Sequence, residues 1–251
     1  MESELHWRQK VADQIKDAWR REKQGWQGPE SDSYNTTRRG LDYIHALGGI
    51  SATAKYVDTS FAGMPILDIG AGSTIGIAEL QECFFPTHTA WGTVLSRPQQ
   101  PLNNFSTLPS DRVVFTPAET LSGLYREFIG SQPNFALVTG VMSIVYSRAP
   151  EQCIRAISKI LPDGGIVKLC LSNSYWGDNN TMLCAMDFYA KFIVAGYGTS
   201  YLRNLRCGDS IVDVVLAVKG RDKSFAINMI NNDLWSRKND AIKMEKFYTS
   251  S

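Results

Sequence analysis

The segment that most constrains the fold of this chain runs from Pro65 to Gly76 and reads PILDIGAGSTIG. An apolar run ends at an acid, two glycines alternate after it, and a helical pattern of apolar residues follows. This order predicts a strand, a tight turn and a helix N-terminus. Such a turn lets the backbone approach a ligand, and the first N–H groups of the helix face the same crevice. An ordinary strand-to-helix turn has the same pattern, so the segment alone leaves both interpretations open.

Short apolar runs alternate with helical segments from residue 64 onward. The predicted strands are Met64–Ile69, Thr89–Ser96, Arg112–Thr116, Phe135–Gly140 and Ile166–Leu171. Between them, apolar residues recur three and four positions apart, as on the buried face of a helix. A repeated strand–helix unit makes crossover connections, and these build a parallel sheet with helices on both faces.

The end of the chain has a different pattern. A helix is predicted around Met182–Ala195, followed by strands at Tyr201–Arg206 and Ile211–Val218. The short link between these strands cannot hold a crossover helix, so they form an antiparallel hairpin. A charged tail with a helical stretch near Phe225–Arg237 follows. The predicted fold class is α/β, a Rossmann-like, doubly wound, mostly parallel seven-stranded sheet with a terminal antiparallel hairpin, preceded by N-terminal helices.

The first sixty residues show helical rather than alternating patterns. Trp7, Val11, Ile15 and Trp19 recur every four residues and form one apolar stripe. The stripe needs a covering surface, either the C-terminal edge of the sheet, as a lid, or a second subunit in a homodimer. We therefore expect a helical cap or lid at 1–60, an α/β domain at 61–220 and a C-terminal tail at 221–251, together one structural unit.

Charge and cysteine usage narrow the class of partner. The formal net charge is +1, which gives no bulk electrostatic case for binding nucleic acid or an anionic membrane. No apolar run is long enough to cross a bilayer, and the N-terminus lacks a signal-peptide pattern. The five cysteines and three histidines are scattered without metal-ligand spacing. We therefore expect reduced thiols, no metal and a cytoplasmic protein.

Three segments, in their order along the chain, resemble the class I S-adenosylmethionine-dependent methyltransferases. Leu67–Gly72 is similar to the first motif of that family, and Ile160–Val167 is similar to its proline-glycine-glycine turn into strand five. Ala195–Tyr197 stands where the family commonly has alanine-glycine-phenylalanine. The resemblance spans about Met64 to Lys219 and is that of a divergent member. It implies S-adenosylmethionine as cofactor and methyl transfer to a small-molecule acceptor.

The resemblance also implies which residues bind the cofactor. Those residues are Asp68, Gly70, Ala71, Gly72, Ser73, Ser96, Ala118, Glu119, Gly140 and Val141. The glycine segment would cradle the methionine part, with Asp68 fixing the turn. The loop after strand three would lie beside the adenine, and the loop after strand four would pass under the sulfonium. Ser96 is the polar residue nearest to the position where the family has a ribose-binding acid.

Candidates for the acceptor side follow strands four and five. Met142 would face the substrate, and Tyr146 could orient an acceptor or pack against a helix. Tyr175 and Trp176 could stack on a flat substrate or simply cover the end of the sheet. Methyl transfer depends mainly on alignment and exclusion of water.

Three candidate residues lie before the sheet. His45 is the candidate general base, because the N-terminal helices often cap the pocket of this fold; a structural histidine is the alternative. Arg38 and Arg39 could meet the cofactor carboxylate or a substrate anion, or they could line an exposed helix face.

Four positions depart from the family pattern. Val94 or Leu95 stands where the family has the ribose-binding acid, Pro117 replaces an aspartate, Ala136 replaces an acid, and Ser73-Thr74 replaces a third glycine. Loss of one charged hydrogen bond, about 1.5–3 kcal/mol, weakens binding roughly ten- to a hundredfold. We expect Glu119 to replace the acid in part. The alternatives are a degenerate methyltransferase-like domain that acts as a binding or partner subunit, and a different reaction on the same fold.

Overall fold

The computed structural model describes residues 38–94, 107–128, 131–144, 149–172, 185–207 and 210–250 of the 251-residue chain. Its strands are β1 Ile66–Ile69, β2 Ala90–Val94, β3 Val113–Phe115, β4 Leu137–Val141, β5 Ile166–Ser172, β6 Tyr197–Cys207 and β7 Ser210–Lys219. Its helices are α2 Gly40–Leu47, α3 Ser51–Ser60, α4 Ile75–Phe84, α5 Leu124–Glu127, α6 Pro150–Ile160, α7 Ala185–Val194 and α8 Lys223–Ser250, with a short 3-10 turn at Ser110–Arg112. The predicted stripe of Trp7, Val11, Ile15 and Trp19 lies outside the described residues.

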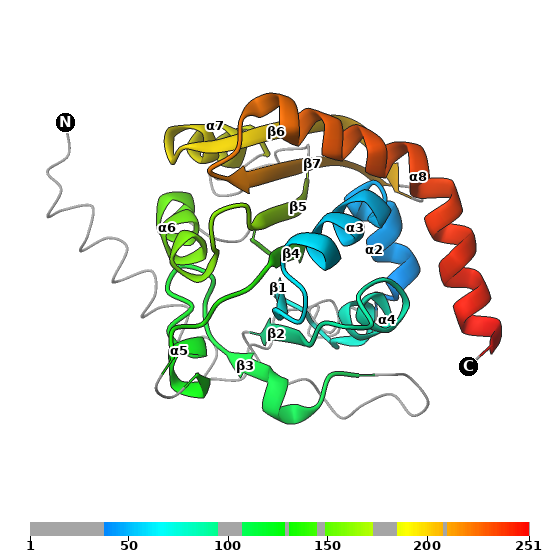
Figure 1. Ribbon diagram of the computed structural model, residues 1–251, viewed down its shortest axis with the longest axis horizontal. Coiled ribbons are helices and arrows are strands. Elements are labelled where there is room, and N and C mark those ends of the chain that lie inside the picture. Colours follow the sequence, from blue (N-terminus) through cyan, green and yellow to red (C-terminus); the bar gives the residue numbers. More distant parts are fainter. Residues whose placement is uncertain are drawn as a thin grey trace, which may run out of the picture.

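One seven-stranded sheet with the order β3-β2-β1-β4-β5-β7-β6 forms the centre of the molecule (Figure 1). Strands β1 to β5 are parallel, and β7 runs antiparallel between β5 and β6. This confirms the predicted fold class. The chain moves outward from β1 through β2 to β3 and then returns to place β4 on the other side of β1. The loops after β1 and β4 therefore leave in opposite directions, which is the topological switch point where such sheets bind ligands.

Helices cover both faces of the sheet (Figure 1). One core lies under α2, α3, α4 and α8, and the other lies under α5, α6 and α7. The parallel strands are buried on both faces, which explains why their sequences are continuous apolar runs. Ile44 and Leu47 of α2 and Val57 of α3 are fully buried in the first core. Residues 38–60 therefore supply part of the main core.

Two element boundaries differ from the sequence expectation by four residues or more. Strand β6 begins at Tyr197, because Gly196 ends α7 with a φ of +82° and the strand follows at once. Helix α8 extends to Ser250, well past the predicted Arg237. Its buried residues include Asp233 and Asp240, so its buried face does not show the apolar periodicity that predicts a helix.

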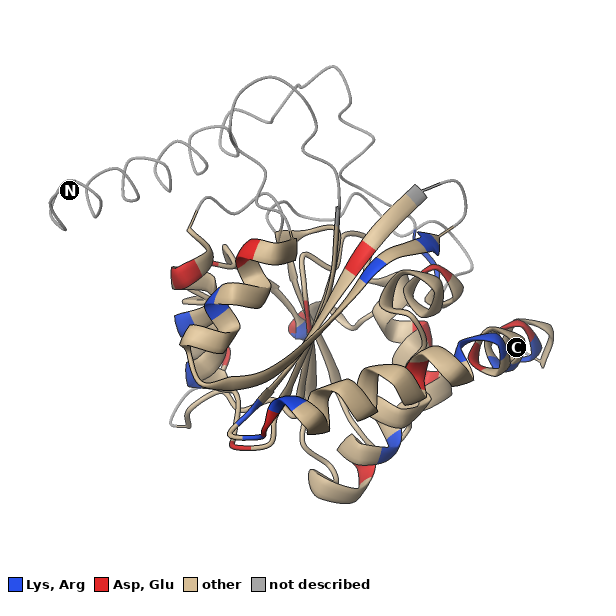
Figure 2. Cartoon of the chain, turned by 90° about the horizontal axis from the view of Figure 1, so that it is seen from above, with Lys and Arg blue, Asp and Glu red and all other residues tan. Residues whose placement is uncertain are grey.

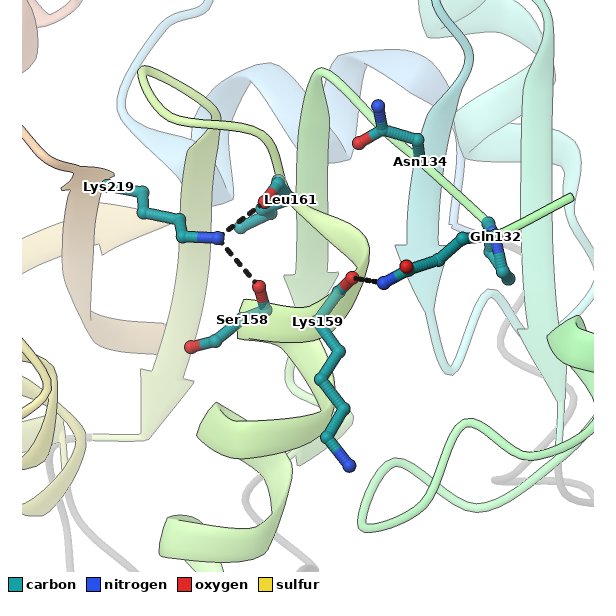
Figure 3. A pocket seen from close by; sticks show the side chains of 7 residues that line it. Gln132, Asn134, Ser158, Lys159, Leu161 and Lys219 are labelled. Atoms are coloured by element: carbon teal, nitrogen blue, oxygen red, sulfur yellow. Dashed lines mark hydrogen bonds between the residues drawn. The ribbon is translucent and has the colours of Figure 1, made fainter.

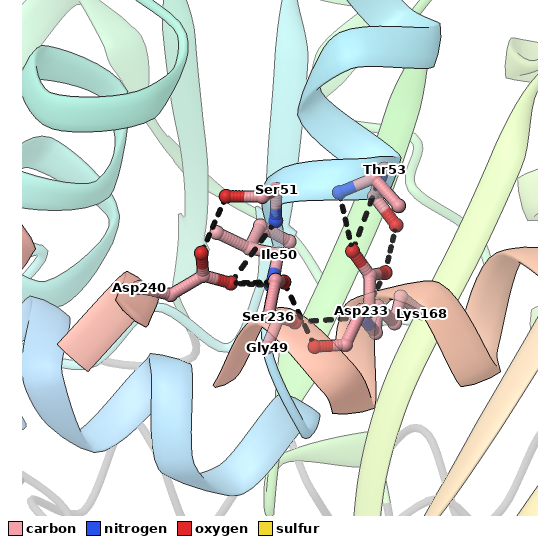
Figure 4. A network of polar contacts seen from close by, with 9 residues as sticks. Gly49, Ile50, Ser51, Thr53, Lys168, Asp233, Ser236 and Asp240 are labelled. Carbon is pink, nitrogen blue, oxygen red and sulfur yellow. Dashed lines mark hydrogen bonds and ion pairs between the residues drawn. The ribbon is translucent and has the colours of Figure 1, made fainter. Parts of the chain in front are cut away.

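The two aspartates of α8 bind the N-terminus of α3 (Figure 4). Asp233 accepts from the backbone N–H of Ala52 at 2.7 Å and of Thr53 at 3.0 Å, and Asp240 accepts from that of Ile50 at 2.8 Å. Lys168 Nζ of β5 lies 2.6 Å from Asp233 Oδ2. These carboxylates satisfy N–H groups that the helix itself leaves without partners, and so they fix α8 to the rest of the fold.

Candidate functional site

The turn after β1, residues 70–74, is called the glycine turn here. Gly70, Gly72 and Thr74 have positive φ angles of 73°, 54° and 65°. Ala71 N donates to the Thr93 carbonyl and Thr74 N donates to the Ala71 carbonyl, both at 2.8 Å. Helix α4 then begins at Ile75. Three left-handed residues within five positions curl the backbone at the carboxyl edge, the edge where β1 to β5 end.

The loop after β4 packs directly against the glycine turn. Ser143 Oγ donates to the carbonyl of Ile69, and a Cβ on Gly70 would lie only 2.3 Å from Ser143 Cβ. Gly70 is therefore required because the two loops touch. Gly140 and Val141 form the end of β4, and Met142 follows them. The structure thus brings these predicted residues together with the glycine turn on both sides of the switch point.

Backbone strain collects at this edge. Thr74 is β-branched yet has a φ of 65°, and Met142 has a φ of 56°. Non-glycine residues in this region are uncommon and cost of order 1–3 kcal/mol each. Thr74 belongs to the Ser73-Thr74 pair that replaces the third glycine of the family motif, and it has the left-handed conformation. Its side chain has a partner, because Leu108 N donates to Thr74 Oγ1 at 3.1 Å.

Asp68, two residues before Gly70, is fully buried. Its Oδ2 accepts from the hydroxyl of Tyr43 at 2.5 Å, and its Oδ1 accepts from Thr139 Oγ1 at 2.7 Å. Burial raises the pKa of Asp68 to about 6, although the two hydrogen bonds and the charge of Arg38 act in the opposite direction. The glycine turn is therefore backed by a carboxyl group that changes charge near neutral pH.

The start of α2 lies over this edge. Arg38 Nη1 donates to the Val141 carbonyl at 3.1 Å, so this arginine is placed at the end of β4. Arg39 is placed elsewhere, with its Nε 2.6 Å from Glu79 Oε1 of α4. Gly40 N donates to Glu79 Oε2 at 2.6 Å. The two neighbouring arginines thus differ, since Arg38 reaches the candidate site and Arg39 pairs with α4.

The turn after β3 carries the next predicted residues. Ala118 and Glu119 are half-buried in a turn closed by a bond from Leu121 N to the Pro117 carbonyl at 3.0 Å. Ala118 packs against the core under α5 to α7. The turn belongs to the carboxyl edge, two strands away from β1. Its carboxylate, Glu119, therefore lies on the β2–β3 side of the crevice.

His45 is half-buried on α2 but does not share a face with Tyr43. Two positions along a helix turn a side chain by roughly 200°, so His45 points away from the side of α2 that meets Asp68. Burial and the charge of Arg237 lower its pKa. The structure does not bring His45 to the glycine turn, and its role as a base stays a prediction. Ser96, Tyr146, Tyr175 and Trp176 lie outside the described residues.

Sequence reasoning missed Tyr43, and it placed Ser143 in the loop after strand four without its contact to Ile69. Both act through partners far away in the sequence, Asp68 for Tyr43 and Ile69 for Ser143. A single tyrosine or serine in a helical or loop segment gives no local signal of such a contact. The one available hint was Gly76, a helix position occupied by a residue that lowers helix stability.

A hollow of about 370 Å³ lies at the opposite, amino edge of the sheet (Figure 3). Lys219 Nζ donates to the carbonyls of Ser158 at 2.9 Å and Leu161 at 2.7 Å, and Gln132 Nε2 donates to that of Lys159 at 2.6 Å. These polar groups complete the C-terminal end of α6. The hollow is therefore separate from the candidate site.

Positions of both charge signs are spread over the helices in Figure 2, where Lys and Arg are blue and Asp and Glu are red. This distribution agrees with the formal net charge of +1. Among the described residues, no helix is both long and apolar enough to cross a membrane.

Comparison with solved structures identifies the fold of this chain. The chain is similar to the sugar N-methyltransferase KedS8 from a Streptoalloteichus species, with a TM-score of 0.50 and 15% identity over 71% of this chain and 88% of that one. It is also similar to the putative methyltransferase in complex with the Trm112 activator from Haloferax volcanii, with a TM-score of 0.49 and 14% identity over 77% and 97% of the two chains. No protein-family model and no curated sequence matches the chain. The chain has the Rossmann-like fold of class I methyltransferases.

Proposed function

We propose that this chain is an S-adenosylmethionine-dependent methyltransferase that acts on a small-molecule acceptor. The observation that carries the proposal is the glycine turn, with three left-handed residues at the switch point between β1 and β4. Strained backbone persists where function requires a particular turn. The first N–H groups of α4 lie behind the turn and suit the polar methionine part of the cofactor.

The residues around the turn support a cationic ligand. The buried carboxyl of Asp68 is a source of negative charge directly behind the turn. S-adenosylmethionine carries the methyl group on a positively charged sulfonium, which makes that group transferable. Gly140 and Val141 would bind the cofactor from the opposite side, and Met142, Tyr146, Tyr175 and Trp176 would orient the acceptor. His45 would serve only an acceptor that must lose a proton.

Glu119 is our candidate for the missing ribose contact. Strand β2 ends at Val94, and no acid follows between residues 92 and 96. Glu119 is half-buried in the turn at the end of β3, the neighbour of β2 in the sheet. Its carboxylate could accept hydrogen bonds from ribose hydroxyls at a small distance from the usual position.

The balance of positive and negative charge on the chain supports a small-molecule acceptor. Mixed surface charge and a net charge of +1 do not favour a polyanion such as nucleic acid. The structural neighbour with the TM-score of 0.50 bears the name sugar N-methyltransferase, which supports a small polar acceptor. We also propose a cytoplasmic location and keep a homodimer as an arrangement to be tested by sedimentation.

A second candidate function is a degenerate methyltransferase-like domain that acts as a binding or partner subunit. Two observations favour it: β2 ends without a carboxylate, and Ala136, where the family has an acid, is fully buried in the core. Such a domain would keep the fold and lose the cofactor.

Calorimetric titration with S-adenosylmethionine and S-adenosylhomocysteine separates the two functions. The enzyme should bind both with micromolar dissociation constants. Absence of heat and of a thermal shift at millimolar ligand would establish the degenerate domain instead.

The same titration tests Glu119. Glu119→Gln should weaken binding roughly ten- to a hundredfold, the effect of one charged hydrogen bond. Glu127→Gln on the exposed face of α5 is the matched control and should bind like the wild type. If the two variants bind equally well, Glu119 is only a solvated loop residue.

A further inference from the structure

The hydroxyl of Tyr43 joins α2 to the carboxyl group behind the glycine turn. Tyr43 is 3% exposed, and its hydroxyl lies 2.5 Å from Asp68 Oδ2. Thr139 Oγ1 of β4 binds the other oxygen at 2.7 Å. Three elements, α2, β1 and β4, therefore meet at one carboxyl group. This group precedes Gly70, the first residue of the turn, by two positions.

Gly76 provides the space for the Tyr43 ring. A Cβ at Gly76 would lie 2.3 Å from Tyr43 Cε2 and 2.6 Å from its Cδ2. Glycine inside a helix costs about 1 kcal/mol relative to alanine, so this position needs a reason. Gly76 has an ordinary negative φ and no turn to make. The last glycine of the Pro65–Gly76 segment thus serves the phenol ring.

We propose that Tyr43 is a positioning residue of the cofactor site, which keeps Asp68 ionised and oriented behind the glycine turn. This inference rests on the proposed function and deepens it. It also links the docking of α2 to the end of β1, because the hydroxyl of an α2 residue binds the carboxyl group two residues before the turn. A cationic cofactor gains from an ionised carboxylate and loses that gain when Asp68 is protonated.

The surroundings of Asp68 agree with this role. Burial raises the pKa of Asp68, and the bond from Tyr43 is the largest opposing influence, followed by the bond from Thr139 and the charge of Arg38. Cys170 of β5 is the further titratable group that acts on Tyr43. Without the phenol hydroxyl, the pKa of Asp68 should rise further, and a smaller fraction would be ionised at pH 7.

The chain contains a matched control for this contact. Tyr248 at the end of α8 donates to Glu79 Oε2 at 2.9 Å and accepts from Leu41 N at 3.0 Å. It is a second phenol that binds a carboxylate beside α2, but its carboxylate belongs to α4 and does not adjoin the turn. Tyr248→Phe should loosen α2 without changing Asp68.

The test combines carboxyl-carbon NMR titration of the free protein with calorimetry from pH 5.5 to 8.5. Asp68→Asn identifies the Asp68 signal. In Tyr43→Phe the Asp68 midpoint should rise by about one pH unit, the effect of a hydrogen bond worth roughly 1.4 kcal/mol. S-adenosylmethionine should bind about threefold more weakly near pH 6.5 and about eightfold more weakly near pH 5.5, and its affinity should recover near pH 8.5. In Tyr248→Phe, midpoint and pH profile should match the wild type.

The inference is wrong if the Asp68 midpoint does not move, if affinity falls equally at every pH, or if Tyr248→Phe gives the same change. In each of these cases the wild type still binds and the proposed function stands. If the wild type itself binds neither ligand at any pH, the proposed function fails and the role of Tyr43 toward a cofactor fails with it.

Discussion

Two buried aspartates, Asp233 of α8 and Asp68 of β1, have opposite surroundings. Asp233 accepts four hydrogen bonds, from two backbone N–H groups, a hydroxyl and the ammonium of Lys168, which is itself fully buried. Among the described residues, Asp68 accepts bonds from two hydroxyls. Asp233 has a cation and N–H groups among its partners, whereas Asp68 has hydroxyl partners and a pKa that burial raises to about 6.

This difference distinguishes a carboxylate that stabilises the fold from a carboxyl group at a candidate functional site. In the Asp233 cluster, a cation and N–H donors surround a buried carboxylate, and these contacts fix two helices in place. A buried carboxyl without a strong donor has a perturbed pKa, and such groups collect at functional sites. The Asp233 cluster holds the N-terminus of α3, whereas Asp68 lies directly behind a loop of the carboxyl edge. Substitutions in the two regions should therefore change different properties.

The largest expected effect is on stability, at the Asp233 cluster. Lys168→Met leaves the Asp233 carboxylate buried without its cation, which should lower the free energy of unfolding by about 3–5 kcal/mol. Lys191→Met is the control, because Lys191 pairs with Glu151 at the surface, where such pairs are worth about 0–1 kcal/mol. Urea denaturation measures both. Equal losses in the two variants would mean that burial of the Lys168 pair has no energetic consequence.

The next effect concerns the pH dependence of stability. The pKa of Asp68 is raised to about 6 from an ordinary 3.8, so the folded state holds this proton more tightly than the unfolded state. Its contribution is fully present below about pH 4 and is lost as the pH rises through 6, a change of roughly 3 kcal/mol. Relative to Asp68→Asn, the wild type should therefore lose stability between pH 4 and 7. A constant difference between the two proteins over this interval would rule out the perturbed titration.

The comparison also shows what a sequence can predict. The parallel strands, the final hairpin and the glycine turn follow from local apolar patterns and turn residues, and the structure has them. The part of α8 beyond Arg237 could not be predicted from local patterns. Its buried face includes aspartates, Asp233 and Asp240, that bind the start of α3 about 180 to 190 positions away in the sequence. The Tyr43–Asp68 contact could not be predicted for the same reason, although Asp68 and Gly70 themselves belong to a motif that the sequence shows. Local periodicity identifies elements, but polar contacts between distant elements leave no periodic signal.

A third effect concerns cofactor affinity. Gly72 has a φ of 54° at the centre of the glycine turn, so Gly72→Val introduces both strain and a branched side chain at the candidate site. Affinity for S-adenosylhomocysteine should fall at least about a hundredfold, or roughly 2.7 kcal/mol, while the sheet stays folded. Gly63→Val is the control, since Gly63 has a φ of 74° and open space around it. Calorimetry and circular dichroism check both variants, and unchanged affinity in folded Gly72→Val would refute the site assignment.

The smallest effect tests the strain at Thr74. Asparagine tolerates the left-handed region better than threonine and can keep an oxygen acceptor for Leu108 N, so Thr74→Asn should stabilise the protein by about 0.5–1 kcal/mol. The chain already uses asparagine at a matched position, because the exposed Asn204 has a φ of 55° in the bulge of β6. Asn204→Thr should therefore cost a similar amount. Urea midpoints give both values, and calorimetry shows whether relief of strain at the turn changes cofactor affinity. A different result is that Thr74→Asn does not raise the free energy of unfolding while Asn204→Thr still lowers it. In that case the contacts of the Thr74 side chain offset the strain of its left-handed backbone, and these contacts stabilise the shape of the turn.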